Sequence, residues 1–493
     1  MQRRALMTGL LAASLAHPSR AADEPFDTQT VRRLARALAD APYRTPDTRL
    51  PDPFGKLSYD DYRQIRFNPS QALWRGSGLP FEAQFFHRGS IFQERVDMHE
   101  VVDGRVQPLP YRAEAFDFGP NPRPEGDVGW AGFRIHAPLN RADYADEVAV
   151  FLGATYFRAV AKGQGYGLSA RTLGIKTADP GGEEFPSFRA FWLERPQPGT
   201  NSMVVTGLLD SPSTSGAARF TIRPGETTVI DVELTLYPRA EITQAGIGGM
   251  ASMFLFDPTN RTIADDYRRA VHDSNGLQMV TGRGEELWRA LANPRTLQVS
   301  SFLDASPRGF GLMQRARSLS AFEDLEARYE KRPSLWIEPI GDWGEGAVQL
   351  VEIPTKLEIH DNIVAQWRPK QPLQAKGEHS FTYRMLWGDT APVRSELARF
   401  TSSRVGAGGP GARLFVLDVA GERLRLAPDA KPRAVVSADR GRIQNITTQP
   451  HDGGGWRIAF ELLPEDNKPS ELRAQLLLGD APLSETWLYR WTA

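Results

Sequence analysis

Two aspartates stand at places in the sequence where a carboxyl group could donate a proton. Asp361 comes just before the apolar run 363–365, at the expected mouth of a strand, and Asp273 lies in the segment VHDSNGLQM. A carboxyl that is partly withdrawn from water has a raised pKa and stays protonated near neutral pH. Such a group can act as a general acid, although an aspartate in either setting can also simply cap a turn.

Cleavage of a glycosidic bond is a reaction that two carboxyl groups commonly perform together. One protonates the leaving oxygen, and the other activates water or attacks directly. A separation of about 6.5–9.5 Å predicts inversion and about 5–5.5 Å predicts retention, unless water or a tyrosine relays the proton. Tyr329, in RYEKRPSLW, is a candidate for such a relay. The sequence leaves the separation of Asp273 and Asp361 open.

The stretch RPSLWIEPIGDWGEG, residues 332–346, places bulky aromatic rings beside carboxylates. Aromatic rings can stack on the apolar faces of sugars while charged side chains bond the hydroxyl groups. The alternative is that the tryptophans belong to a core and the carboxylates are solvated. The candidates for binding a sugar are Trp336, Glu338, Arg332 and Trp343.

Short alternating segments predict that strands position these groups. In TTVIDVELTLYP, residues 227–238, apolar residues at 230, 232, 234 and 236 alternate with residues that are mostly polar, as in an antiparallel sheet over a core. Helices are expected at 27–42 and at 57–65. The first has Asp27 or Thr28 as its cap and Val31, Leu34 and Leu38 at helical spacing.

The pattern as a whole predicts an all-β protein with two units. Strand-rich sequence continues to about residue 387, which favours one large antiparallel β-sandwich over 23–390. Four glycines around a proline at 406–411 indicate a connection, assigned to 391–410. The remaining residues, 411–493, have the length and strand spacing of a small immunoglobulin-like sandwich.

The first 22 residues, MQRRALMTGLLAASLAHPSRAA, are typical of an export signal, with cleavage expected near Ala22. The apolar run of about 12 residues is short of the ~20 that span a bilayer. Arg3 and Arg4 favour the twin-arginine route, and an ordinary secretory signal is the alternative. We expect a periplasmic protein that is not inserted in the membrane.

Composition excludes several other classes of function. The chain has 59 basic and 60 acidic residues without long runs of either sign, which argues against nucleic acid as a partner. It has no cysteine, so it carries no disulfide and no thiol nucleophile. The eight histidines form no HExxH pair, and no phosphate-binding or dinucleotide loop is present. We therefore expect neither a metal nor a cofactor, and the oligomeric state stays open.

Several long motifs resemble one family. They are AQFFH (83–87), FLGATYFRAVAKGQGYGLSARTLGI (151–175), GEEFPSFRAFWLE (182–194), KRPSLWIEP (331–339), VEIPTKLEIHDNIVAQW (351–367) and SETWLYRW (484–491). In this order they resemble the periplasmic glucans biosynthesis proteins of the G and D type, from about residue 25 to the C-terminus. The twin arginines favour the D type.

This resemblance implies a large galactose-mutarotase-like β-sandwich followed by an immunoglobulin-like domain. It also implies an inverting endo-β-1,2-glucanase that acts on osmoregulated periplasmic glucan. Asp361 matches the general acid of that family, and Asp273 and Tyr329 match residues of its water relay and substrate site. Two alternatives stay open: a β-1,2-glucan transglycosylase, and a non-catalytic glucan-binding partner of a membrane glucosyltransferase that docks through the C-terminal domain.

Overall fold

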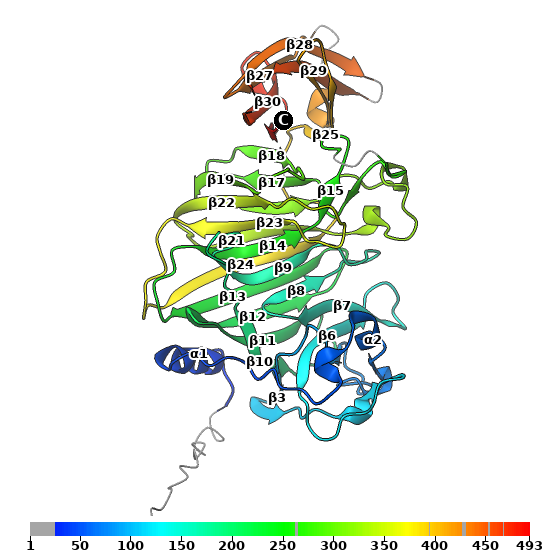
Figure 1. The fold of residues 1–493 in the computed structure, drawn as a ribbon, viewed down its shortest axis with the longest axis vertical. Helices are drawn as coiled ribbons and strands as arrows, with labels where there is room; N and C mark the ends of the chain where they lie inside the picture. The colour runs from blue at the N-terminus through cyan, green and yellow to red at the C-terminus, as the bar shows by residue number, and fades with distance from the viewer. Residues whose placement is uncertain (1–24, 262–264, 394, 426–429, 452–453, 467) are drawn as a thin grey trace, which may run out of the picture.

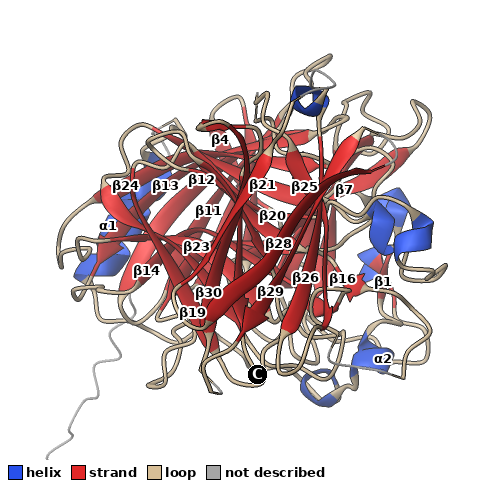
Figure 2. Cartoon of the chain, turned by 90° about the horizontal axis from the view of Figure 1, so that it is seen from above, coloured by secondary structure: helices blue, strands red, loops and turns tan. Residues whose placement is uncertain are grey.

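The computed structural model describes residues 25–261, 265–393, 395–425, 430–451, 454–466 and 468–493. The predicted export signal lies outside these residues. Among them, strands fill the body of the molecule and helices lie at its periphery (Figure 2). The α-helices are α1 (Thr30–Asp40) and α2 (Tyr59–Tyr62). The short 3₁₀ helices are η1 (Phe54–Lys56), η2 (Pro69–Gln71), η3 (Ala113–Ala115), η4 (Leu319–Ala321), η5 (Tyr329–Lys331) and η6 (Glu422–Leu424).

A long sheet of 15 strands runs through the molecule (Figure 1). Its pairings are antiparallel except for two parallel pairs, β10 with β3 and β18 with β32, so the sheet is mixed. In spatial order its strands are β27 (Arg433–Ala438), β30 (Ser470–Leu478), β32 (Thr486–Trp491), β18 (Glu286–Ala290), β17 (Gly276–Val280), β20 (Gly309–Met313), β21 (Ser334–Ile340), β24 (His379–Gly388), β13 (Thr228–Pro238), β12 (Thr214–Arg223), β11 (Met203–Asp210), β10 (Ser187–Glu194), β3 (Asp97–Val102) and β4 (Arg105–Pro108), with β31 (Ala481–Pro482) beside β30.

Two further sheets complete the architecture. The nine-stranded sheet has the order β19 (Gln298–Ala305), β22 (Glu345–Glu352), β23 (Ile363–Pro369), β14 (Ala245–Ser252), β9 (Ser169–Ile175), β8 (Tyr156–Ala159), β7 (Ala145–Leu152), β6 (Trp130–Pro138) and β2 (Glu82–His87). The four-stranded sheet has the order β25 (Arg399–Ala407), β26 (Arg413–Ala420), β29 (Gly455–Leu463) and β28 (Arg442–His451). Two small pairs are β1 (Arg66–Phe67) with β5 (Phe116–Asp117) and β15 (Phe254–Phe256) with β16 (Val271–His272).

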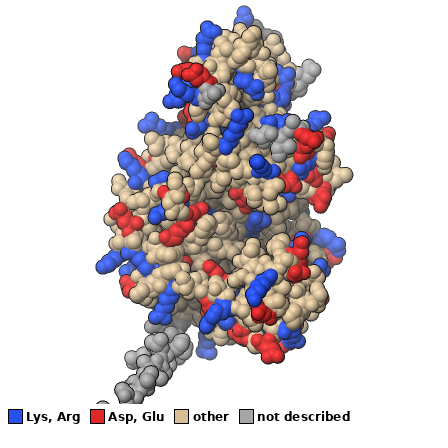
Figure 3. Space-filling model, viewed as in Figure 1, with Lys and Arg blue, Asp and Glu red and all other residues tan. Residues whose placement is uncertain are grey.

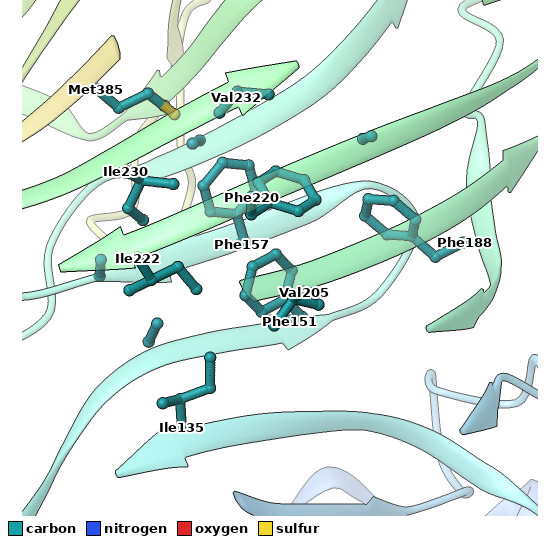
Figure 4. Packing of buried hydrophobic residues seen from close by; sticks show 14 of the residues in the cluster. Ile135, Phe151, Phe157, Phe188, Val205, Phe220, Ile222, Ile230, Val232 and Met385 are labelled. Carbon is teal, nitrogen blue, oxygen red and sulfur yellow. The ribbon is translucent and has the colours of Figure 1, made fainter. Parts of the chain in front are cut away.

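The main core lies between the long sheet and the nine-stranded sheet. Figure 4 shows Phe151 and Phe157 of the nine-stranded sheet against Phe220 of the long sheet, with ring centroids 5.1 and 5.2 Å apart. The alternation predicted for β13 is confirmed, because its apolar residues from Ile230 to Leu236 are buried in this core. Burial of each large apolar side chain contributes about 1.5–3 kcal/mol, so the facing apolar rows hold the two sheets together.

A second core joins the C-terminal strands to the body. It includes Phe415, Phe460 and Trp487, together with Trp288 of the long sheet. Because β32 pairs with β18, the C-terminal strands β27, β30 and β32 extend the long sheet. Strand β25 lies inside the range 391–410 that the sequence assigned to a connection, and its edge pairs with β26 from Arg399 to Ala407. The C-terminal part is therefore joined to the body by continuous strand pairing as well as by the chain.

Helix α1 confirms one of the two predicted helices, and α2 confirms the other. The prediction of Asp27 or Thr28 as the cap of α1 is wrong, because the N-cap residue is Gln29. The Asp27 carboxylate accepts a hydrogen bond from the Gln29 backbone amide at 2.9 Å. Val31 and Ala35 are buried against β11, β12 and β13, whereas Leu34 is 42 % exposed. Leu38 packs against the same cluster, so two of the three predicted positions face inward and the prediction is wrong at Leu34. Ala35 takes the inward position instead, and its small side chain lets the helix approach the sheet.

A buried ion pair ties two parts of the body together and is open to test. Arg289 of β18 donates to Glu352 of β22 at 3.0 Å, and each side chain is 1 % exposed. Removing one partner leaves an uncompensated buried charge, so Glu352→Ala should lower the free energy of unfolding by about 3–5 kcal/mol. Equilibrium urea unfolding measures this change.

The matched control is Glu345→Ala, because Glu345 pairs with Lys370 on the surface, where both side chains are well exposed. Surface pairs contribute little, so this variant should unfold almost like the wild type. Equal effects of the two substitutions would contradict the assignment of Glu352 as a buried structural charge.

Candidate functional site

Asp361 lies at one end of the nine-stranded sheet, where neighbouring strands β9, β14 and β23 begin or end. Ala251 of β14 pairs with Ser169 of β9 and with Val364 of β23, so these strands meet in register. Asp361 precedes β23 and reaches back over this end. The Ser169 hydroxyl donates to its Oδ2 at 3.4 Å, and the Arg158 guanidinium of β8 lies 3.6 Å from the same oxygen.

The surroundings of Asp361 suit a carboxyl that holds a proton. About a third of its side chain, 32 %, is exposed, so a ligand can reach it. Burial of the remainder raises its pKa above the usual value, while Arg158, the Ser169 hydroxyl and Arg332 act in the opposite direction. The group is therefore both accessible and biased towards its protonated form.

Asp273 is the buried partner in this cluster. Its side chain is 4 % exposed and accepts a hydrogen bond from Arg332. Burial raises the pKa of Asp273 to about 6, Arg332 lowers it, and the charge of Asp361 raises it further. The two aspartates therefore influence each other's ionisation.

Tyr329 is the first residue of the short helix η5, and Arg332 is the residue that follows it. The Arg332 guanidinium lies 4.3 Å from the centre of the Tyr329 ring, and burial raises the pKa of the Tyr329 hydroxyl. Gly167 packs against Arg332, where an added Cβ would come within 2.9 Å of the Arg332 Cβ. The glycine lets the β8–β9 connection approach Arg332, which brings the turn close to Arg158 and Ser169.

The structure thus brings together four of the seven residues that the sequence singled out: Asp361, Asp273, Tyr329 and Arg332. Sequence reasoning missed Arg158 and Ser169 as members of the cluster. Both lie in the motif at 151–175, but no spacing in that motif marks a charge partner for a residue about 200 positions away. Their role depends on strand order, which only the fold provides.

The two tryptophans of the 332–346 stretch are placed elsewhere. Trp336 is 2 % exposed and belongs to the core beneath the C-terminal strands. Trp343 is 6 % exposed, packs against Trp367, Phe381 and Tyr383, and donates to the Thr382 carbonyl at 3.2 Å. In this structure both rings fill cores and neither presents a face to solvent.

Glu338 is also separated from the aspartates. It is half-buried and stands opposite Arg384 in the pairing of β21 with β24, within the long sheet. Of the whole stretch 332–346, the carboxylate cluster contains its first residue, Arg332.

Acidic and basic side chains are intermixed over the face in Figure 3, and a hollow crosses it near the level of β7 and β8. Among the described residues, no group of three His, Cys, Asp or Glu side chains is arranged to hold a metal ion. In the same part of the chain, every helix is too short or too polar to cross a bilayer.

The fold and the site define a β-rich protein with a carboxylate and arginine cluster at one end of two packed sheets. A family model described as "Periplasmic glucan biosynthesis protein, MdoG" matches residues 26–491. The chain belongs to this family, and it is a periplasmic protein of glucan biosynthesis.

Individual relatives support this assignment. The chain is 58 % identical over 501 residues to "Glucans biosynthesis protein G" of Rhodopseudomonas palustris and 55 % identical over 502 residues to that of Bradyrhizobium diazoefficiens, with 100 % of both chains covered in each case. It is 50 % identical over 475 residues to the protein of the same name from Vibrio cholerae, covering 95 % of this chain and 87 % of that one.

These relatives correct the expectation of a D type protein, because they carry the name of the G type. That expectation depended on Arg3 and Arg4 alone. Two basic residues at the start of an export signal are common to many exported proteins, so they do not distinguish the types.

The raised pKa of Asp273 predicts a specific pH dependence of stability. Its native pKa of about 6 lies above the ordinary value of 3.8. A group of this kind favours the folded state at low pH, and its contribution is lost as pH rises through about 6. We therefore expect the difference in unfolding free energy, wild type minus Asp273→Asn, to fall by about 3 kcal/mol between pH 3 and pH 7.

Urea unfolding at several pH values measures this difference. Asp342→Asn is the control, because hydrogen bonds from Ser306 and from the Gly344 backbone lower the pKa of Asp342. The difference in unfolding free energy between wild type and Asp342→Asn should instead rise with pH, and it should do so at a lower pH. A flat difference for Asp273 would show that its carboxyl titrates normally in the folded protein.

Proposed function

We propose that this protein is an endo-acting glycoside hydrolase that cleaves linear β-1,2-glucan in the periplasm. The observation that carries the proposal is the accessible Asp361, whose pKa is raised by burial, beside the buried pair of Asp273 and Arg332. Membership of a glucan biosynthesis family supplies the substrate class.

In the proposed mechanism, Asp361 protonates the glycosidic oxygen of the leaving sugar. Water attacks the anomeric carbon from the opposite face, and its proton passes to Asp273 through a relay that includes Tyr329. Asp273 is too deeply buried to touch a sugar carbon, which argues against direct attack by its carboxylate. This burial favours inversion over retention. Arg332, whose side chain is 22 % exposed, holds Asp273 and reaches the substrate side.

A cavity on the same sheet supports binding of an extended sugar chain. It has a volume of about 850 Å³ and is lined by aromatic residues, including Tyr59, Phe86 and Phe92, and by Arg134. Arg134 of β6 and Arg158 of β8 each pair with Val150 of β7, so both side chains lie on one face of the sheet, two strands apart. The proposed binding track for the sugar chain follows this face, from the cavity that Arg134 lines to Asp361 beside Arg158.

Substitution of the general acid tests the proposal. Wild-type protein should release short oligosaccharides from linear β-1,2-glucan, and Asp361→Asn should lose activity by about 10²–10⁴-fold because the leaving oxygen is no longer protonated. Chromatography of the products and NMR of their anomeric configuration make the measurement. Asp342→Asn, in an exposed turn held by Ser306, is the matched control and should retain wild-type activity.

Other outcomes of the same assay separate the alternatives. Cyclic or rearranged glucan would identify a transglycosylase. If the wild type binds glucan without cleaving it, the remaining hypothesis is a non-catalytic glucan-binding partner of a membrane glucosyltransferase. Equal activity of wild type and Asp361→Asn would refute the assigned role of Asp361.

The aromatic cavity gives a separate prediction. Phe86 lies beneath the Arg134 guanidinium, 5.5 Å from ring centre to Cζ, on the wall of the cavity. The ring supports Arg134 and forms part of the aromatic wall, and these contacts bind substrate and transition state alike. Phe86→Ala should therefore raise KM for long glucan by several-fold and leave kcat nearly unchanged. Steady-state kinetics with glucans of graded length measure the effect. Unchanged KM and kcat for long glucan would place the cavity outside the binding track.

A further inference from the structure

The segment that carries Asp273 is held by three consecutive residues at the end of β20, Met313, Gln314 and Arg315. The Asn275 amide donates to the Met313 carbonyl at 2.9 Å. The Gln314 side-chain amide donates to the His272 carbonyl at 3.1 Å and lies 3.2 Å from His272 Nδ1. The Arg315 backbone amide donates to the Asn275 side-chain oxygen at 3.0 Å.

The side chain of Arg315 crosses to the C-terminal strands. Its guanidinium bonds both carboxylate oxygens of Glu485, with 2.9 Å for the Nη2–Oε2 bond. It also donates to the Phe400 carbonyl at 2.8 Å and lies 3.5 Å from the centre of the Trp288 ring. Glu485 is fully buried and accepts a further bond from the Phe400 amide at 2.8 Å.

This joint is rigid for a physical reason. A bidentate arginine–carboxylate pair fixes both distance and orientation, and a buried charge cannot leave its partner without a large cost. Arg315 is therefore fixed at its side chain by the C-terminal domain and at its backbone by Asn275. Only one residue, Ser274, separates Asn275 from Asp273.

We propose that the C-terminal domain positions Asp273 through the Glu485–Arg315 pair. Glu485 and Arg315 are then positioning residues for the carboxylate cluster as well as a joint between domains. Other bonds hold the same segment from its opposite side: the Asp273 amide donates to the Met253 carbonyl at 2.8 Å, and the Ser252 hydroxyl donates to that of Ser274 at 2.9 Å. Weakening the joint therefore loosens one side of the segment and leaves the other in place.

The proposal rests on the proposed function for its kinetic readout and on amide exchange for an independent one. Glu485→Gln keeps the shape of the side chain and removes its charge. Because displacement of a reacting group by about 1 Å can cost 10²-fold, this variant should lose about 10- to 100-fold in kcat with little change in KM. Hydrogen exchange at the Asn275 amide should become faster. Arg315→Lys keeps the charge but loses the bidentate geometry, and it should change both readouts in the same direction.

A matched control and a double variant isolate the effect. Glu100→Gln removes a buried charge of the same kind, since Glu100 pairs with Arg195 and accepts a bond from Trp74 at 2.7 Å, in β3 and far along the sheet from the site. It should change neither kcat nor exchange at Asn275. In the Asp273→Asn background, Glu485→Gln should cause no further loss of kcat, because it acts through Asp273.

The outcomes are separable. Full additivity of Asp273→Asn and Glu485→Gln, or unchanged exchange at Asn275 in folded Glu485→Gln and Arg315→Lys, would overturn the proposal. If the wild type cleaves no glucan, the proposed function fails, and exchange at Asn275 alone decides whether the C-terminal domain holds this segment.

Discussion

The ion pair between Asp273 and Arg332 is the constraint on which the site depends. A carboxylate that is 4 % exposed loses most of its hydration and must be compensated by a cation or by a proton. Arg332 supplies the cation, yet burial still raises the pKa of Asp273 to about 6. The group therefore lies close to its titration point at neutral pH, where a proton acceptor is most effective. In the proposed mechanism, Asp361, at the exposed end of the same cluster, instead donates a proton.

The surrounding fold serves to keep these two carboxyls in different environments. The nine-stranded sheet carries Asp361, Arg158 and Ser169 at one end, where strands meet in register. The turn around Tyr329 brings Arg332 against Gly167, a position that a larger residue could not occupy without displacing the arginine. Because the long sheet continues into the C-terminal strands, the same framework that packs the main core also reaches the segment of Asp273.

Local sequence was sufficient to predict the strand-rich fold and part of the site. Alternation in β13 predicted which residues face the core, since side chains of a strand point alternately to opposite faces. Asp273, Asp361, Tyr329 and Arg332 were found from residue type and from the resemblance to a family. The sandwich types and the role of each residue remain predictions.

The tryptophans show where sequence reasoning reached its limit. Trp336 and Glu338 lie on the same face of β21, but the C-terminal core covers the tryptophan and leaves the glutamate half-exposed. Which layer covers a strand depends on residues far away in the sequence, such as Trp487, which packs in the same core as Trp336. Trp343 lies in a turn between Gly341 and Gly344, both at positive φ, and its ring packs into the main core. Aromatic residues near carboxylates in sequence therefore need not share a surface.

The most direct test of this account is a crystal structure of the Asp361→Asn variant with a linear β-1,2-glucan oligosaccharide. The account predicts that a glycosidic oxygen lies within hydrogen-bond distance of the side-chain amide at position 361, with a water near Tyr329 on the opposite face of the sugar. An oligosaccharide bound with its nearest glycosidic oxygen away from this position, at another part of the surface, would contradict it.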